Sequence, residues 1–216
     1  MAITYNDIFT SEGLNTLAFI DPFAKISFIG SVISQYQNIS FLDLDTTFTA
    51  YFNAGLFDGI IKQYSLNYQN CNKIRIYLPG ENRFEILLKE VIRSMHGKSI
   101  VIIDSINSFF TLYYSLLKIQ SGQGLGVINH LLYTLLMILV KQGRNLGIPV
   151  LATYMLRYGK GIEWNRDASS KRIIHSKSLV RLYAEIESSK FISLDILSHP
   201  TLPPQNLKIQ FTELKI

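Results

Sequence analysis

Short apolar runs that alternate with helical patterns are the feature that most limits how this chain can fold. Five runs of this kind occur, at Lys25–Ile29, Ile39–Leu44, Lys73–Leu78, Ser99–Asp104 and Ile148–Thr153. Nearly continuous, β-rich apolar runs are typical of parallel strands that are covered on both faces. Helices are expected between them, at Ala50–Ser65, Arg83–His96 and Val127–Asn145, with Gly147 as the C-cap of the last. The alternation predicts an α/β fold with a mainly parallel central sheet flanked by helices.

The pattern changes after Lys177. Three segments alternate apolar and polar residues, namely Leu179–Glu187, Lys190–Leu197 and Leu207–Leu214. Such alternation predicts strands with one partly solvated face, so we expect an antiparallel extension of the sheet at the C-terminal side. No linker or repeat divides the chain, and we expect a single domain in which residues 25–216 form the core and residues 1–24 form a lead-in.

Composition excludes several classes of protein. The chain has 216 residues, of which 48% are hydrophobic and 17% charged, which excludes disorder as the main state. The single cysteine, Cys71, excludes an intrachain disulfide and a cysteine-rich zinc site, and it fits a cytoplasmic protein. We expect neither a metal nor another cofactor. The net charge of +5 is mild evidence for a polyanionic partner.

Two segments bear on targeting. The first 13 residues have neither the basic region nor the apolar stretch of a signal peptide. Residues 119–140 have no charged side chain, yet their first half holds several polar residues and three glycines. The continuous apolar part is shorter than the roughly 20 residues of a membrane span. We expect a buried helix there and no membrane partner.

The end of the first predicted strand offers no phosphate-binding loop. In open α/β sheets ligands bind beyond the carboxyl ends of the strands, and here that strand leads into Gly30. A phosphate loop needs a second glycine followed by Lys and Ser or Thr, and none of these follows Gly30. Lys25 begins the predicted strand and would lie at its opposite end. We therefore expect no conventional ATP hydrolysis.

Three aspartates follow apolar strands. Asp104 ends the run Ser99–Asp104, and Asp43 and Asp45 close the run before them. An aspartate in this position holds a magnesium-bound water in nucleotide-hydrolysing proteins. The alternative is that Asp104 caps the next helix or binds a neighbouring loop, and the missing phosphate loop favours that alternative for all three.

Several segments together resemble the catalytic core of the RecA/RadA recombinases, in particular an archaeal RadA paralogue. The similar segments, in family order, are Asp43–Phe48 (DLDTTF), Ile102–Phe109 (IIDSINSF), Ile148–Leu156 (IPVLATYML), His175–Tyr183 (HSKSLVRLY) and Leu197–Pro203 (LSHPTLP). The resemblance runs from about residue 25 to the C-terminal end and implies a RecA-like fold. KaiC-like proteins share this core and remain an alternative.

Departures from the family pattern imply a protein without ATPase activity. The Walker A motif is absent, Asp45 stands where the family has its catalytic glutamate, and Tyr154 replaces the polar residue that senses the γ-phosphate. By this resemblance Gly30, Asp45 and Asp104 mark a vestigial nucleotide site, and no catalytic residue is expected. The implied role is assistance to a RadA-type recombinase in homologous recombination and DNA repair.

The resemblance also indicates where DNA would bind, because the recombinases grip DNA with two loops after their fourth and fifth strands. The second matching segment, Met155–Ile174, is basic and contains the only tryptophan. Cations for phosphates and an aromatic ring for bases are what single-strand binding needs. The expected contacts are Arg157, Lys160, Trp164, Arg166, Lys171 and Arg172, with Lys118 from the first loop, Leu112–Gly126. The alternative is an ordinary solvated loop.

Two other functions stay open. The chain could be a structural subunit of a RecA- or KaiC-like oligomer without DNA contact, and in either case we expect a homo- or hetero-oligomer. It could also be an enzyme with an atypical nucleotide site, which would need a lysine or arginine that reaches the end of the first strand from elsewhere.

Overall fold

The computed structural model describes residues 4–58, 74–79, 84–116, 124–156, 176–188 and 190–210. These residues form one sheet with the strand order β3-β2-β4-β5-β1-β6-β7-β8. The strands are β1 (Leu14–Phe19), β2 (Ile39–Asp43), β3 (Ile74–Tyr77), β4 (Ile100–Asp104), β5 (Val150–Met155), β6 (Ser178–Ser188), β7 (Phe191–Ser198) and β8 (Gln205–Gln210). The first six strands in chain order are parallel, and β7 and β8 extend the sheet antiparallel to their neighbours.

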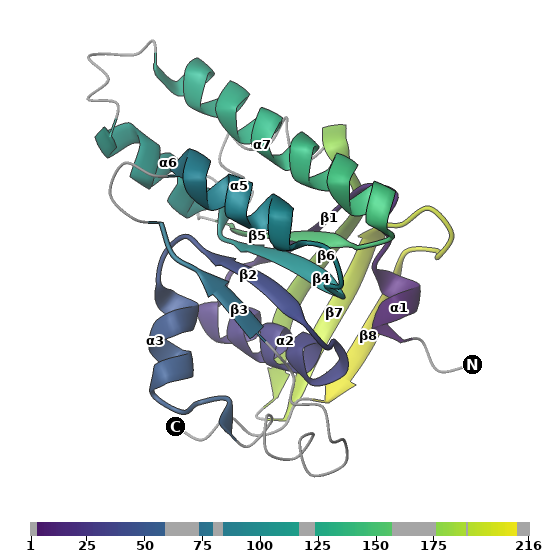
Figure 1. Ribbon diagram of the computed structural model, residues 1–216. Coiled ribbons are helices and arrows are strands. Elements are labelled where there is room, and N and C mark those ends of the chain that lie inside the picture. Colours follow the sequence, from purple (N-terminus) through teal and green to yellow (C-terminus); the bar gives the residue numbers. More distant parts are fainter. Residues whose placement is uncertain are drawn as a thin grey trace.

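Helices cover both faces of the sheet (Figure 1). The described helices are α1 (Tyr5–Ile8), α2 (Pro22–Gln35), α3 (Thr47–Asn53), α5 (Phe84–Ser94), α6 (Ile106–Leu116) and α7 (Gly124–Leu146). Side chains of α1, α2 and α3 pack in one core cluster, and those of α5, α6 and α7 pack in a second cluster on the other face. Strands β2, β4 and β5 are almost wholly buried, as parallel strands between two helical layers must be.

Most predicted elements are confirmed. The apolar runs near residues 39, 73, 99 and 148 form β2, β3, β4 and β5, and two of the predicted helices are α5 and α7. Gly147 follows α7 with a φ of 68°, the left-handed conformation of a helix C-cap. The antiparallel extension is present as β6, β7 and β8, although residues 211–214 lie outside the described residues. The same holds for residues 59–65 of the expected helix Ala50–Ser65.

The strand predicted at Lys25–Ile29 is wrong, because this segment lies inside helix α2. Ten consecutive residues of α2, Ala24–Ile33, are buried, so its sequence is as continuously apolar as that of a buried strand. Periodicity alone cannot separate these two cases. The chain signals the helix start differently: Asp21 is the N-cap and Pro22 is the first helical residue.

The true first strand is β1, which lies in the segment expected to precede the core. All six of its residues are buried, and it is paired in parallel with β5 on one side and β6 on the other. The lead-in boundary at residue 24 is therefore also wrong, since β1 is an interior strand of the sheet. None of the described helices is both long and apolar enough to cross a membrane.

Candidate functional site

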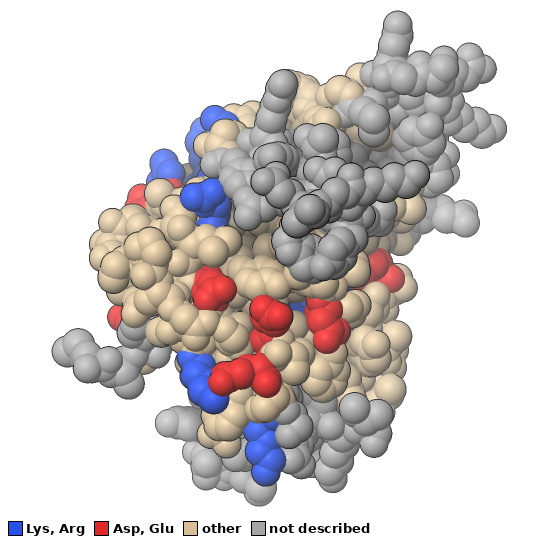
Figure 2. Space-filling model, turned by 180° about the vertical axis from the view of Figure 1, so that it is seen from behind, with Lys and Arg blue, Asp and Glu red and all other residues tan. Residues whose placement is uncertain are grey.

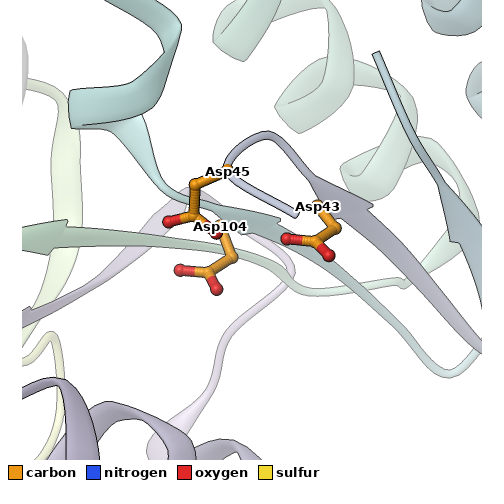
Figure 3. A group of neighbouring side chains, drawn as sticks. All are labelled: Asp43, Asp45 and Asp104. Atoms are coloured by element: carbon orange, nitrogen blue, oxygen red, sulfur yellow. The ribbon is translucent and has the colours of Figure 1, made fainter. Parts of the chain in front are cut away.

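The carboxyl ends of β1, β2 and β4 bring four charged side chains together. Asp43 and Asp104 end β2 and β4, which are neighbours in register, and Asp45 follows two residues after Asp43. Lys25 comes from the first turns of α2, directly after β1. One oxygen from each aspartate lies within 4.8 Å of the other two (Figure 3). This group of four is called the carboxylate cluster below.

Lys25 is the cation of the carboxylate cluster. Its Nζ donates a hydrogen bond to Asp104 Oδ2 at 2.8 Å and lies 3.7 Å from Asp45 Oδ2. Its ammonium also lies 5.5 Å from the centre of the Phe19 ring. The Lys25 side chain is only 3% exposed and that of Asp104 is fully buried. An ammonium held this way by two carboxylates is not free to meet a phosphate.

Asp104 is held from two sides. Thr153 Oγ1 on β5 donates a hydrogen bond to its Oδ1, and Lys25 occupies its Oδ2. Burial raises the pKa of Asp104 to about 6, although the Lys25 charge opposes this shift, and the nearby Asp45 carboxylate adds to it. A buried carboxyl beside another one favours its neutral form for both reasons.

Asp43 is only half satisfied. Its Oδ2 accepts hydrogen bonds from the Thr49 amide at 2.7 Å and the Thr49 hydroxyl at 2.6 Å. Its Oδ1 is buried and has no hydrogen-bond partner, and one of its oxygens is directed toward Asp45 in Figure 3. Burial is the main cause that raises the pKa of Asp43, with the Thr49 hydrogen bonds opposing it.

Asp45 is the exposed member of the carboxylate cluster. Its side chain is 25% exposed, its Oδ1 accepts a hydrogen bond from the Thr47 amide at 3.0 Å, and Ser108 Oγ lies 3.4 Å from its Oδ2. Thr46, between Asp45 and α3, has a φ of 61°, which turns the chain sharply after β2. The turn lets Asp45 lie back over the strand ends.

The start of α2 occupies the place of a phosphate-binding loop. Counted back from Lys25, the motif's two glycine positions hold Phe19 and Ala24, and its Ser or Thr position holds Ile26. Only Ile20 and Asp21 separate β1 from α2. Asp21 Oδ1 accepts the Phe23 amide at 2.8 Å, so the chain's own carboxylate already occupies the helix N-terminus. A triphosphate would meet this negative charge and an engaged lysine, and the residues present do not fit a nucleotide.

An acidic cavity lies beside this helix start. Asp21, Tyr183 and Glu185 line it together with Ile20, Ala184 and Ile186, and its volume is about 390 Å³. Burial raises the pKa of Tyr183, and the negative charges of Glu185 and Asp195 add to the effect. Figure 2 shows acidic side chains gathered on this side of the molecule, around the middle of the described surface. The field here repels anions.

The sequence analysis identified two of the cluster residues in their correct place and misplaced others. Asp45 and Asp104 lie together as expected. Gly30 does not, because it lies within the buried part of α2 instead of at a strand end. Lys25 reaches the site, contrary to the expectation that it lies at the opposite end of the strand. The signal that would have found it is the sequence Asp21-Pro22, which marks a helix start four residues before Lys25.

The expected DNA contacts cannot be placed. Arg157, Lys160, Trp164, Arg166, Lys171, Arg172 and Lys118 all lie outside the described residues. Part of the first expected loop, Leu112–Gly126, belongs to helices α6 and α7. Of the four histidines expected to be structural, His199 fits that role, because its Nδ1 accepts the amides of Thr201 and Leu202.

This sheet order, with helices on both faces and an antiparallel extension, is that of a RecA-like ATPase domain. Among solved structures, the chain is similar to the ATPase domain of another protein, with a TM-score of 0.61 and 14% sequence identity. The match covers 95% of this chain and 84% of that chain. At this identity the likeness concerns the fold. No family model and no curated protein matches the chain.

Proposed function

We propose that this chain is a RecA-fold protein that does not hydrolyse ATP and acts by binding other macromolecules. The observation that carries the proposal is the pair of internal contacts at the start of α2. Lys25 is bound to Asp104 at 2.8 Å, and Asp21 caps the helix end where a phosphate would be held. Both charges that govern phosphate binding are thus satisfied within the chain.

The partner we propose is single-stranded DNA, a RadA-type recombinase, or both, in homologous recombination and repair. The ordered resemblance to the recombinases supports this role. The charge of residues 157–177 supports it independently, because six basic residues face two acidic ones and Trp164 lies among them. This segment follows β5, on the same edge of the sheet as the carboxylate cluster.

Fluorescence anisotropy of a labelled single-stranded oligonucleotide tests DNA binding, at several salt concentrations and without ATP. We expect micromolar or tighter binding at low salt, weakening as salt rises with a slope of about −0.7 per phosphate engaged. The variant Arg166→Ala/Lys171→Ala/Arg172→Ala should bind at least about tenfold more weakly. Its control removes the same charge from α5 and α7, as Lys89→Ala/Arg93→Ala/Lys141→Ala, at three exposed positions.

Equal losses in the two triple variants would show nonspecific attraction by net charge and would contradict a site on residues 157–172. No binding at low salt would contradict direct DNA contact altogether. A radiolabelled ATP hydrolysis assay tests the other half of the proposal. Turnover above the background of a Lys25→Met variant would contradict a non-hydrolysing protein.

A structural subunit of a RecA- or KaiC-like oligomer is the second candidate. The observation that favours it is the sheet itself, because β3 and β8 end the described sheet with one neighbouring strand each. Terminal strands carry backbone groups that can pair with another chain. Sedimentation velocity over a concentration series, alone and with a RadA-type recombinase, measures this assembly. A monomer at all concentrations that also fails to join the recombinase would contradict it.

A further inference from the structure

The carboxylate cluster carries more negative charge than its lysine neutralises. Three carboxylates and one ammonium leave a formal charge of −2 when all are ionised. Asp43 and Asp104 are both 0% exposed, so water does not compensate them. Among the described residues, Lys25 is the only cation that the ion-pair geometry places on these aspartates. A buried excess charge is very unfavourable unless a counter-charge or a proton joins it.

The unpaired oxygen of Asp43 points to where that counter-charge would lie. Asp43 Oδ1 is buried without a hydrogen-bond partner while Oδ2 is fully used by Thr49. Figure 3 shows an Asp43 oxygen directed toward Asp45, with Asp104 alongside. Asp45 Oδ2 has only the long contacts of 3.4 Å to Ser108 and 3.7 Å to Lys25. Two carboxylate oxygens therefore face each other without a donor between them.

We propose that Asp43, Asp45 and Asp104 bind one hard divalent cation, Mg²⁺ or Ca²⁺, in the absence of any nucleotide. Oxygen ligands from carboxylates are those that both ions prefer. One oxygen of each aspartate lies within 4.8 Å of the others, close enough for a single ion to contact all three. Asp43 and Asp45 supply the two least satisfied oxygens, while Asp104 also keeps its contacts to Lys25 and Thr153. The proposal does not depend on DNA binding.

Calorimetry on the chelator-treated full chain tests the proposal, with MgCl₂ and CaCl₂ as separate probes and no nucleotide present. We expect one equivalent of cation to bind. The melting temperature should rise by roughly 5–10 °C at a hundredfold excess over Kd. Sodium chloride at matched ionic strength controls for screening. Whichever ion gives the larger shift is the one that the cluster prefers.

Variants locate the ion. Asp43→Asn keeps an oxygen for Thr49 and should lose the cation-dependent shift, whereas Glu90→Gln, an exposed carboxylate on α5, should keep it. If Asp43→Asn fails to fold, Asp45→Asn decides, because that side chain is 25% exposed. Lys25→Met should bind the cation about tenfold or more tightly, since a like charge is removed from beside the ion.

Two results would overturn the site. One is the absence of both heat and melting shift up to about 10 mM cation, beyond the weakest range of protein calcium sites. The excess charge would then be neutralised by protons shared among the aspartates. The other is an unchanged shift in Asp45→Asn or an unchanged affinity in Lys25→Met, which would place any bound ion elsewhere on the protein.

Discussion

Lys25 and Asp104 are 79 residues apart in sequence, yet their charged atoms lie 2.8 Å apart in the interior. The pair connects α2 to the end of β4 and so joins one helical layer to the middle of the sheet. Removing one partner of a buried pair leaves the other charge uncompensated, which is far worse than lacking the pair entirely.

Lys25→Met should therefore destabilise the fold by about 3 kcal/mol, measured by urea denaturation in the presence of a chelator. Met keeps the length and apolar character of the lysine stem, so lost packing contributes little. Lys141→Met on the exposed face of α7 is the control and should change stability by less than about 0.5 kcal/mol. If both variants unfold at the same urea concentration, the ion pair contributes nothing to stability.

Asp21→Ala should lower stability by about 1 kcal/mol, because the Phe23 amide loses its cap at the start of α2. Asp21→Ser keeps a capping oxygen and should lie within a few tenths of a kcal/mol of the parent protein. Guanidinium denaturation followed by circular dichroism measures both. Equal losses in the two variants would show that the negative charge, and not the cap, is what stabilises the helix.

Stability should fall as pH rises above 10. Burial raises the pKa of Tyr36 from 10.0 to about 12, so the unfolded chain loses this proton before the folded protein does. The contribution is fully present below pH 10 and is lost as the pH rises through about 12, a loss of up to about 2.7 kcal/mol. Burial raises the pKa of Tyr5 in the same direction.

Denaturation at pH 9 and pH 11, with phenolate absorbance as the titration signal, measures this loss. Tyr36→Phe removes the titrating group and should show a smaller drop between the two pH values. A drop as large as that of the parent protein would assign the alkaline loss to Tyr5 or to other groups.

Gly143→Ala should destabilise the protein by about 1–3 kcal/mol, because a Cβ there would lie 2.5 Å from the Ile148 carbonyl oxygen. That carbonyl belongs to the backbone and cannot rotate away as a side chain could. Gly126→Ala in the same helix meets nothing within 4 Å and should be neutral or slightly stabilising. Thermal unfolding of the two variants compares them, and a stable Gly143→Ala would mean that α7 and the turn after it can separate freely.

The strands β2, β4 and β5 could be predicted because their sequences are short, β-rich and bounded by polar residues. The juxtaposition of Asp45 and Asp104 followed from them, since parallel strands end at a common edge. Helix α2 could not be separated from a strand by apolarity, because the sheet covers it so completely that its polar face nearly disappears. That error displaced the first strand and put Lys25 at the wrong end of it. The partnerless oxygen of Asp43 depends on side-chain geometry, which no sequence pattern carries.

The position of β1 has a consequence for the order of events during synthesis. Its Asn15 side chain binds the backbone of Val150, and its Thr16 side chain binds that of Val180, so its neighbours follow it by 135 and 164 residues. At roughly 5–20 residues per second, a ribosome needs roughly ten to thirty seconds to deliver both. For that time the apolar strand has no native partner and depends on chaperones or transient collapse. The centre of this sheet is thus translated early and completed late.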